Sequence, residues 1–71
     1  MGTYVLCNAD RSIQTVQRSD EPPSEIDIEA NVPGGFAIDV TDEGDFDSME
    51  LLDIYDNYKV AAKKNKLIKR K

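Results

Sequence analysis

A Pro-Gly-Gly sequence at Pro33–Gly35 places the strongest local constraint on how this chain folds. Proline fixes one backbone angle and glycine tolerates a positive φ, so we expect the chain to change direction sharply here. The residues that follow alternate with the period of a strand. One face of this strand would carry Phe36, Ile38 and Val40, and the other Ala37, Asp39 and Thr41. We expect Phe36 and Ile38 to lie in the core.

Two strand-like runs precede this turn, at residues 3–7 and 12–17. Both are rich in β-branched, aromatic and apolar residues, and the Asn-Ala-Asp between them accepts turn geometry, so they predict a hairpin. Residues 18–25 hold two prolines and no large apolar side chain, which predicts a flexible surface loop. Isoleucines alternate with acids around residues 26–28, a pattern that predicts a short half-buried strand or an extended edge.

A short helix is expected over residues 48–57. Asp47 and Glu50 have the spacing of a capping box, which favours a helix start at this point. Apolar residues then recur at helical intervals and would form one stripe. The members of that stripe are Leu51, Tyr55, Tyr58 and Ala62.

The C-terminal segment, residues 59–71, carries seven basic residues and no acid, whereas residues 1–58 carry all 14 acids and two arginines, a net charge of −12. Two interpretations fit this segment. Its alanines and lysines favour continuation of the helix, because the helix dipole favours cations near a C-terminus. Its alternation and the Lys64-Asn65 pair favour two strands joined by a turn. We expect strands that fold against the chain's own domain, with the lysines near its acidic surface, because four apolar residues lie between the lysines: Val60, Ala62, Leu67 and Ile68.

These elements predict a small single α+β domain over residues 1–71. A chain of this length buries only about 60% of the surface that it exposes when unfolded. With no histidine and one cysteine, the chain can form neither an intramolecular disulfide nor a Cys/His zinc site. Cys7 lies in an apolar run with no histidine to activate it, so we interpret it as a buried structural residue. We expect no enzymatic activity and no cofactor, because no nucleophile is paired with a base and no glycine loop is suited to phosphate.

The acidic stretch from residue 39 to residue 50 has the spacing of a calcium-binding loop around Gly44. Thr41 and Glu43 stand where Asp or Asn is usual, and no entering helix is expected before the stretch. The second interpretation, an acidic loop followed by a helix N-cap, needs no metal, and we favour it. The candidate ligands are Asp39, Thr41, Glu43, Asp45, Asp47 and Glu50.

The basic segment offers cations for binding and an aromatic ring for stacking. We expect the partner to be another protein and not a nucleic acid, because residues 1–58 would repel a polyanion. A homo-oligomer formed through a free strand edge also fits the pattern. No run reaches the ~20 apolar residues of a membrane span and no secretion signal is visible, so we expect no membrane contact. The candidate binding residues are Tyr58, Lys59, Lys63, Lys64, Lys66, Lys69 and Arg70.

The order of the motifs resembles that of small phage and prophage proteins of the tail region and fibre-associated modules. The resemblance is carried by VLCNADRSIQTV, VPGGFAIDV, LLDIYDNYKV and KNKLIKR, which match a hairpin, a Pro-Gly-Gly-aromatic kink and a terminal strand pair. The chain departs from that pattern by placing Lys-Lys-Asn where such hairpins usually have a glycine turn. The resemblance implies a non-enzymatic structural or accessory protein that binds or assembles with other proteins, in the host cytoplasm or the virion. The alternative is a small acidic inhibitor of a host protein that mimics nucleic acid.

Overall fold

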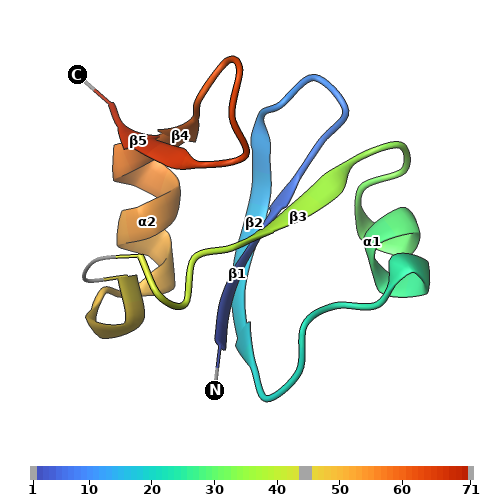
Figure 1. Cartoon of the computed structure of the whole chain (residues 1–71), viewed down its shortest axis with the longest axis horizontal. Helices are drawn as coiled ribbons and strands as arrows, with labels where there is room; N and C mark the ends of the chain where they lie inside the picture. Colours follow the sequence, from blue (N-terminus) through green and yellow to red (C-terminus); the bar gives the residue numbers. More distant parts are fainter. Residues whose placement is uncertain (1, 44–45, 71) are drawn as a thin grey trace.

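The computed structural model describes residues 2–43 and 46–70, which form a three-stranded antiparallel sheet, two short α-helices and a separate two-stranded hairpin (Figure 1). This content confirms the predicted small α+β fold. In chain order the elements are β1 (Gly2–Cys7), β2 (Ile13–Ser19), α1 (Glu25–Asn31), β3 (Phe36–Asp39), the 3₁₀ helix η1 (Phe46–Ser48), α2 (Leu51–Asn57), β4 (Tyr58–Val60) and β5 (Leu67–Lys69).

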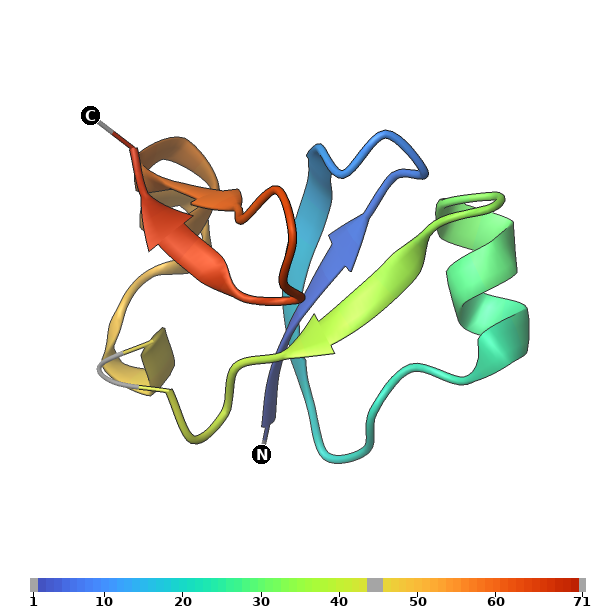
Figure 2. The same ribbon diagram turned by 45° about the horizontal axis from the view of Figure 1, so that its top comes forward.

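Strand β1 is the centre of the larger sheet, with β2 and β3 antiparallel on either side. Val5 lies opposite Val16 on one side and opposite Ile38 on the other. Helix α1 lies on one side of the sheet, while α2 and the β4–β5 hairpin lie on the other (Figures 1 and 2). Because both faces are covered, every residue of β1 is buried and the strand shows no alternation of exposure.

The main core lies between one face of the sheet and the C-terminal elements. Burial of this apolar surface, at roughly 25 cal/mol per Å², is the main stabilising term for a domain of this size. Both strands of the terminal hairpin contribute to it, so the C-terminal segment is an integral part of the domain. The buried members of the cluster are Val5, Cys7, Ile13, Val16, Ile38, Val40, Phe46, Ile54, Val60 and Leu67.

The N-terminal hairpin is confirmed, with each strand one residue longer than predicted. Its turn is closed by a hydrogen bond from the Asn8 amide to the Ser12 carbonyl oxygen at 2.8 Å. The Asp10 carboxylate accepts a hydrogen bond from the Ser12 hydroxyl at 2.6 Å. Strand β2 extends to Ser19 and α1 begins at Glu25, so the loop that follows the hairpin is shorter than the predicted span of 18–25.

The Pro-Gly-Gly turn and the strand after it are also confirmed. Gly34 has a φ of +75°, and a Cβ atom at Gly35 would lie 2.0 Å from the Cys7 carbonyl oxygen, so both positions require glycine. Strand β3 begins directly afterwards, and Ile38 is buried as expected. Phe36 is only half-buried, because its ring lies at the edge of the core beneath the Arg11 guanidinium. It is therefore a peripheral core residue.

Residues 25–31 form a helix, so the strand predicted around residues 26–28 is wrong. Ser24 caps this helix in a capping box. Its hydroxyl accepts a hydrogen bond from the Asp27 amide at 3.2 Å, and the Asp27 carboxylate accepts one from the Ser24 amide at 3.3 Å. Ile26 is 82% exposed, so the two isoleucines of this segment do not share a buried strand face.

A helix forms where residues 48–57 predicted one, but α2 begins only at Leu51, after the 3₁₀ turn of η1. Glu50 is its N-cap and makes no side-chain capping bond, so the predicted capping box with Asp47 is wrong. The predicted stripe is wrong in part: Leu51 and Tyr58 pack against the core, but Tyr55 is 41% exposed and the buried residue of the helix is Ile54.

The strand interpretation of the C-terminal segment is confirmed. Val60 pairs with Leu67, and the Ala61 amide donates to the Lys66 carbonyl oxygen at 2.9 Å, which closes the loop between the strands. This loop spans residues 61–66 and is longer than the predicted two-residue turn. Among residues 2–43 and 46–70, no helix has the length and apolar character needed to cross a membrane.

Candidate functional site

The candidate site is the surface of residues 58–70, here called the cationic hairpin, which comprises β4, the loop 61–66, β5 and Arg70. Its inner side is anchored by apolar packing, since Val60 and Leu67 are both buried in the core. Tyr58 is half-buried and its ring meets the Phe46 ring edge-on, with 4.9 Å between centroids and an interplanar angle of 71°. This packing fixes the orientation of the outer side.

Arg11, in the turn between β1 and β2, holds the loop of the cationic hairpin. Its guanidinium donates to the Ala61 carbonyl oxygen from Nε at 3.2 Å and from Nη2 at 3.0 Å. Nη2 also donates to the Lys64 carbonyl oxygen at 2.8 Å and to the Asn65 side-chain oxygen at 3.2 Å. Its guanidinium carbon lies 5.2 Å from the centre of the Phe36 ring, a cation–π distance. One side chain thus fixes a loop that lies 50 or more residues away.

Arg18, on β2, makes a similar set of hydrogen bonds to the segment that precedes α2. It donates to the Phe46 carbonyl oxygen at 2.7 Å, to the Met49 carbonyl oxygen, and to the Thr3 hydroxyl at 3.3 Å. Arg11 and Arg18 are the two basic residues of residues 1–58. Because both bind the protein's own backbone, the other basic side chains that the structure describes all belong to the cationic hairpin.

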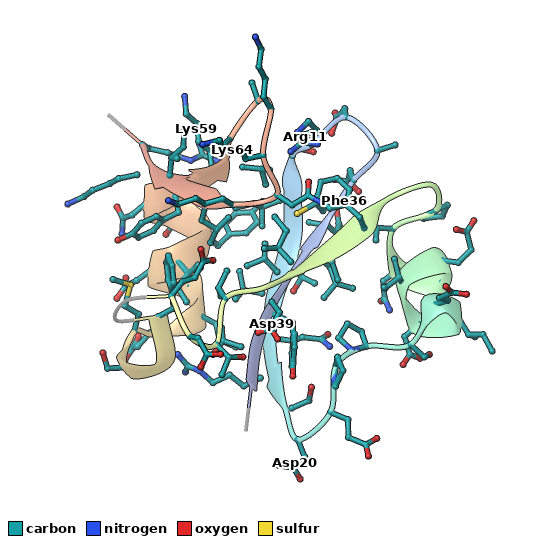
Figure 3. All side chains as sticks on the ribbon, viewed as in Figure 1. Arg11, Asp20, Phe36, Asp39, Lys59 and Lys64 are labelled. Carbon is teal, nitrogen blue, oxygen red and sulfur yellow. The ribbon has the colours of Figure 1, made fainter. Side chains whose placement is uncertain are left out.

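The six described cations of the cationic hairpin are exposed, and Figure 3 shows Lys59 and Lys64 pointing away from the sheet. Arg70 is partly fixed, since its Nε donates to the Tyr58 carbonyl oxygen at 3.0 Å. Asp20 lies at the opposite end of the molecule in the same view. We expected the lysines to lie near the acidic surface, and Lys69 does line one surface hollow together with Asp53 of α2. The six cations are Lys59, Lys63, Lys64, Lys66, Lys69 and Arg70.

Five exposed carboxylates occur in residues 20–29, here called the acidic segment, which runs from the end of β2 into α1 and contains no cation. Two of them help to fix its shape, since Asp27 closes the capping box and Glu29 accepts a hydrogen bond from the Gly34 amide at 3.3 Å. The exposed side chain of Ile26 lies among them. The five are Asp20, Glu21, Glu25, Asp27 and Glu29.

Of the predicted calcium ligands, Asp39 and Thr41 take part in hydrogen bonds with nearby groups of the protein itself. The Asp39 carboxylate accepts a hydrogen bond from the Thr41 amide at 2.9 Å, and hydrogen bonds from Thr41 lower the pKa of Asp39. The Thr41 hydroxyl in turn accepts a bond from the Thr3 amide at 3.1 Å. Glu43 is half-buried, and Glu50 stands at the N-cap position of α2 without a side-chain capping bond.

Two further members of that predicted set, Asp45 and the side chain of Asp47, lie outside the described residues. Within residues 2–43 and 46–70, no group of three or more acidic or cysteine side chains is arranged to hold a metal ion. The geometry of the described ligands therefore matches an acidic loop that is closed by its own hydrogen bonds.

The buried thiol of Cys7 has the chemistry of a structural residue. It lies in the central strand, and burial raises its pKa from 9.0 to about 11, so the thiol stays protonated at neutral pH. A shallow, mainly apolar groove of about 290 Å³ lies between β2 and α2, lined by Gln14, Thr15, Val16, Leu51, Leu52 and Tyr55.

Together these features define a small α+β domain that carries a fixed cationic hairpin on one side of its sheet and an acidic segment on the other. Comparison with protein-family models, with curated proteins and with solved structures finds no match to this chain.

Proposed function

We propose that this chain is a non-enzymatic protein-binding or assembly module, which contacts its partner through the exposed cations of the cationic hairpin. The observation that carries the proposal is the attachment of that hairpin. Its apolar side is buried and its loop is fixed by Arg11, while six cations face solvent. An array of charges on a fixed backbone loses less conformational freedom on binding than a free tail would, so more of its electrostatic attraction appears as affinity.

A protein with an acidic surface fits this array better than a nucleic acid. The five carboxylates of the acidic segment and the other acids of residues 1–58 repel a long polyanion. In addition, the Tyr58 ring, which was the candidate for stacking on a base, packs against Phe46. Both observations support a protein partner.

The resemblance to phage and prophage proteins of the tail region supports a structural or accessory role, in the virion or in the host cytoplasm. The non-enzymatic character is supported by the buried, protonated thiol of Cys7 and by the shallow form of the groove between β2 and α2. Neither offers an activated nucleophile in an enclosed pocket.

A second candidate function is inhibition of a host protein by mimicry of nucleic acid. The observation that favours it is the acidic segment, which presents five exposed carboxylates without an intervening cation. Such a surface fits a basic groove on another protein. In this case the acidic segment, and not the cationic hairpin, would make the contact.

Affinity capture from phage-producing cells distinguishes the two candidates. Three baits are compared at about 50 mM and about 500 mM salt: the unmodified chain, Lys59→Glu with Lys66→Glu, and Asp20→Lys with Glu21→Lys. We expect a partner that is lost at high salt and with the lysine variant but is retained by the acidic-segment variant. Loss with the acidic-segment variant alone would favour the inhibitor. An identical set of captured proteins for all three baits would overturn both.

A further inference from the structure

Two surfaces of opposite charge face away from each other on this molecule. The cationic hairpin carries six described cations and no acid, and the acidic segment carries five acids and no cation. The hairpin and α1 lie on opposite sides of the sheet in both ribbon views (Figures 1 and 2). The two charges are nearly equal in magnitude, so each surface is electrostatically complementary to the other.

The two surfaces cannot meet within one chain. The sheet separates them, Arg11 fixes the loop of the hairpin, and the capping box at Ser24 and Asp27 fixes the start of α1. Their attraction can therefore be satisfied by direct contact only when a second molecule supplies the complementary surface. A second copy of this chain supplies both.

Each surface also has an exposed isoleucine among its charges. Ile26 is 82% exposed and lies one helical turn from Glu29 on α1. Ile68 is 39% exposed and lies opposite Lys59 in the register of β4 and β5. A protein–protein contact usually has an apolar centre that excludes water and a polar rim that remains solvated.

We infer that the cationic hairpin of one copy docks on the acidic segment of a second copy, with Ile68 and Ile26 near the centre of the contact. This inference rests on the binding role proposed for the hairpin. The contact joins two different surfaces, so each pair leaves one free hairpin and one free acidic segment, and repetition forms an open chain or a closed ring. The surfaces are small and charged, so association is weak and is suppressed by salt.

Sedimentation velocity of the purified chain, and of variants in which charged residues are replaced by residues of opposite charge, tests this contact. At low salt the chain should sediment faster as its concentration rises, and at about 500 mM salt it should sediment as a monomer. The hairpin variant, Lys59→Glu with Lys66→Glu, and the acidic-segment variant, Asp20→Lys with Glu21→Lys, should each be monomeric alone. An equal mixture of the two should associate again, because the intact acidic segment of the hairpin variant then meets the intact hairpin of the acidic-segment variant.

A control matched to the acidic-segment variant carries the same change of charge at exposed sites outside both surfaces, Asp42→Lys with Asp56→Lys. It should retain salt-sensitive association. A monomer at every concentration and salt, unchanged association in both single-surface variants, or no recovery in the mixture would each overturn the inference. If the chain is monomeric but the hairpin variant still loses a captured virion or host protein, self-association fails and the proposed binding function stands.

Discussion

The Arg11 guanidinium donates two hydrogen bonds to the Ala61 carbonyl oxygen, at 3.2 Å and 3.0 Å, and so joins the first turn of the chain to its last loop. The arginine itself has a positive φ of 72°, a conformation that is costly for a residue with a side chain. The contact therefore compensates for local backbone strain. It also explains how a loop with lysines at its tip keeps one orientation.

Replacement of Arg11 separates the effect of its hydrogen bonds on stability from the effect of its strained backbone. Arg11→Ala removes the hydrogen bonds and keeps the strain, so we expect the free energy of unfolding to fall by about 1.5–3 kcal/mol. Arg11→Gly also removes the bonds but relieves the backbone, and should recover about 1 kcal/mol of that loss. Urea denaturation followed by circular dichroism measures both. Equal stability of the two variants would refute the strain, and unchanged stability in both would refute the hydrogen-bonded contact.

Leu67 and its neighbour Ile68 form a matched pair on β5. Leu67 is buried in the core, so Leu67→Ala should lower the free energy of unfolding by about 2–5 kcal/mol. Ile68 is on the outer side and partly exposed, so Ile68→Ala should change it by less than about 1 kcal/mol. Thermal and urea unfolding give both values. Two small effects would mean that the segment does not pack on the domain.

Helix α2 provides a second matched pair. Ile54 is fully buried against the sheet, and its replacement by alanine should cost about 2–5 kcal/mol of unfolding free energy. Tyr55→Ala should cost much less, because that ring lies at the rim of the groove between β2 and α2. The same denaturation measurement applies. A larger effect at Tyr55 than at Ile54 would restore the helical stripe that the sequence suggests.

The buried thiol of Cys7 predicts a dependence of stability on alkaline pH. Its pKa is raised in the folded state from 9.0 to about 11, so the unfolded chain loses this proton first. The stability contributed by the protonated thiol is complete below pH 9.0 and is lost as the pH rises toward about 11. Unfolding free energies measured across this range should fall more steeply for the unmodified chain than for Cys7→Ala. Parallel slopes would contradict a buried, protonated thiol.

Local sequence patterns predicted the parts of the fold that depend on neighbouring residues. The N-terminal hairpin, the turn at Gly34 and Gly35, and the strand after it all follow from turn chemistry and alternation. The short isoleucine alternation of residues 26–28 predicts a strand, but a helix forms because Ser24 and Asp27 have the spacing of a capping box and fix its start. Which face of α2 is buried depends on its tertiary contact with the sheet, and local sequence patterns do not determine that contact.

The candidate site was predicted in its composition but not in its geometry. The lysines of the C-terminal segment are evident from charge alone. Their outward direction follows from Arg11, whose acceptors lie 50 or more residues along the chain, beyond the range of any local pattern. One signal points to this role: Arg11 and Arg18 are isolated cations in an otherwise acidic stretch, and the five donors of a guanidinium suit it to several hydrogen bonds at once.

Amide hydrogen exchange in the cationic hairpin tests most directly whether it is a fixed surface. The Ala61 amide donates to the Lys66 carbonyl oxygen at 2.9 Å, and the Arg70 amide donates to the Asn57 carbonyl oxygen at 2.8 Å. In a folded hairpin, both amides exchange more slowly than the same amides of the chain unfolded in urea, and Arg11→Ala speeds the exchange of Ala61. Exchange of both amides at the unfolded rate, while the amides of β1 remain protected, would show that the segment is a free tail and would contradict a fixed binding surface.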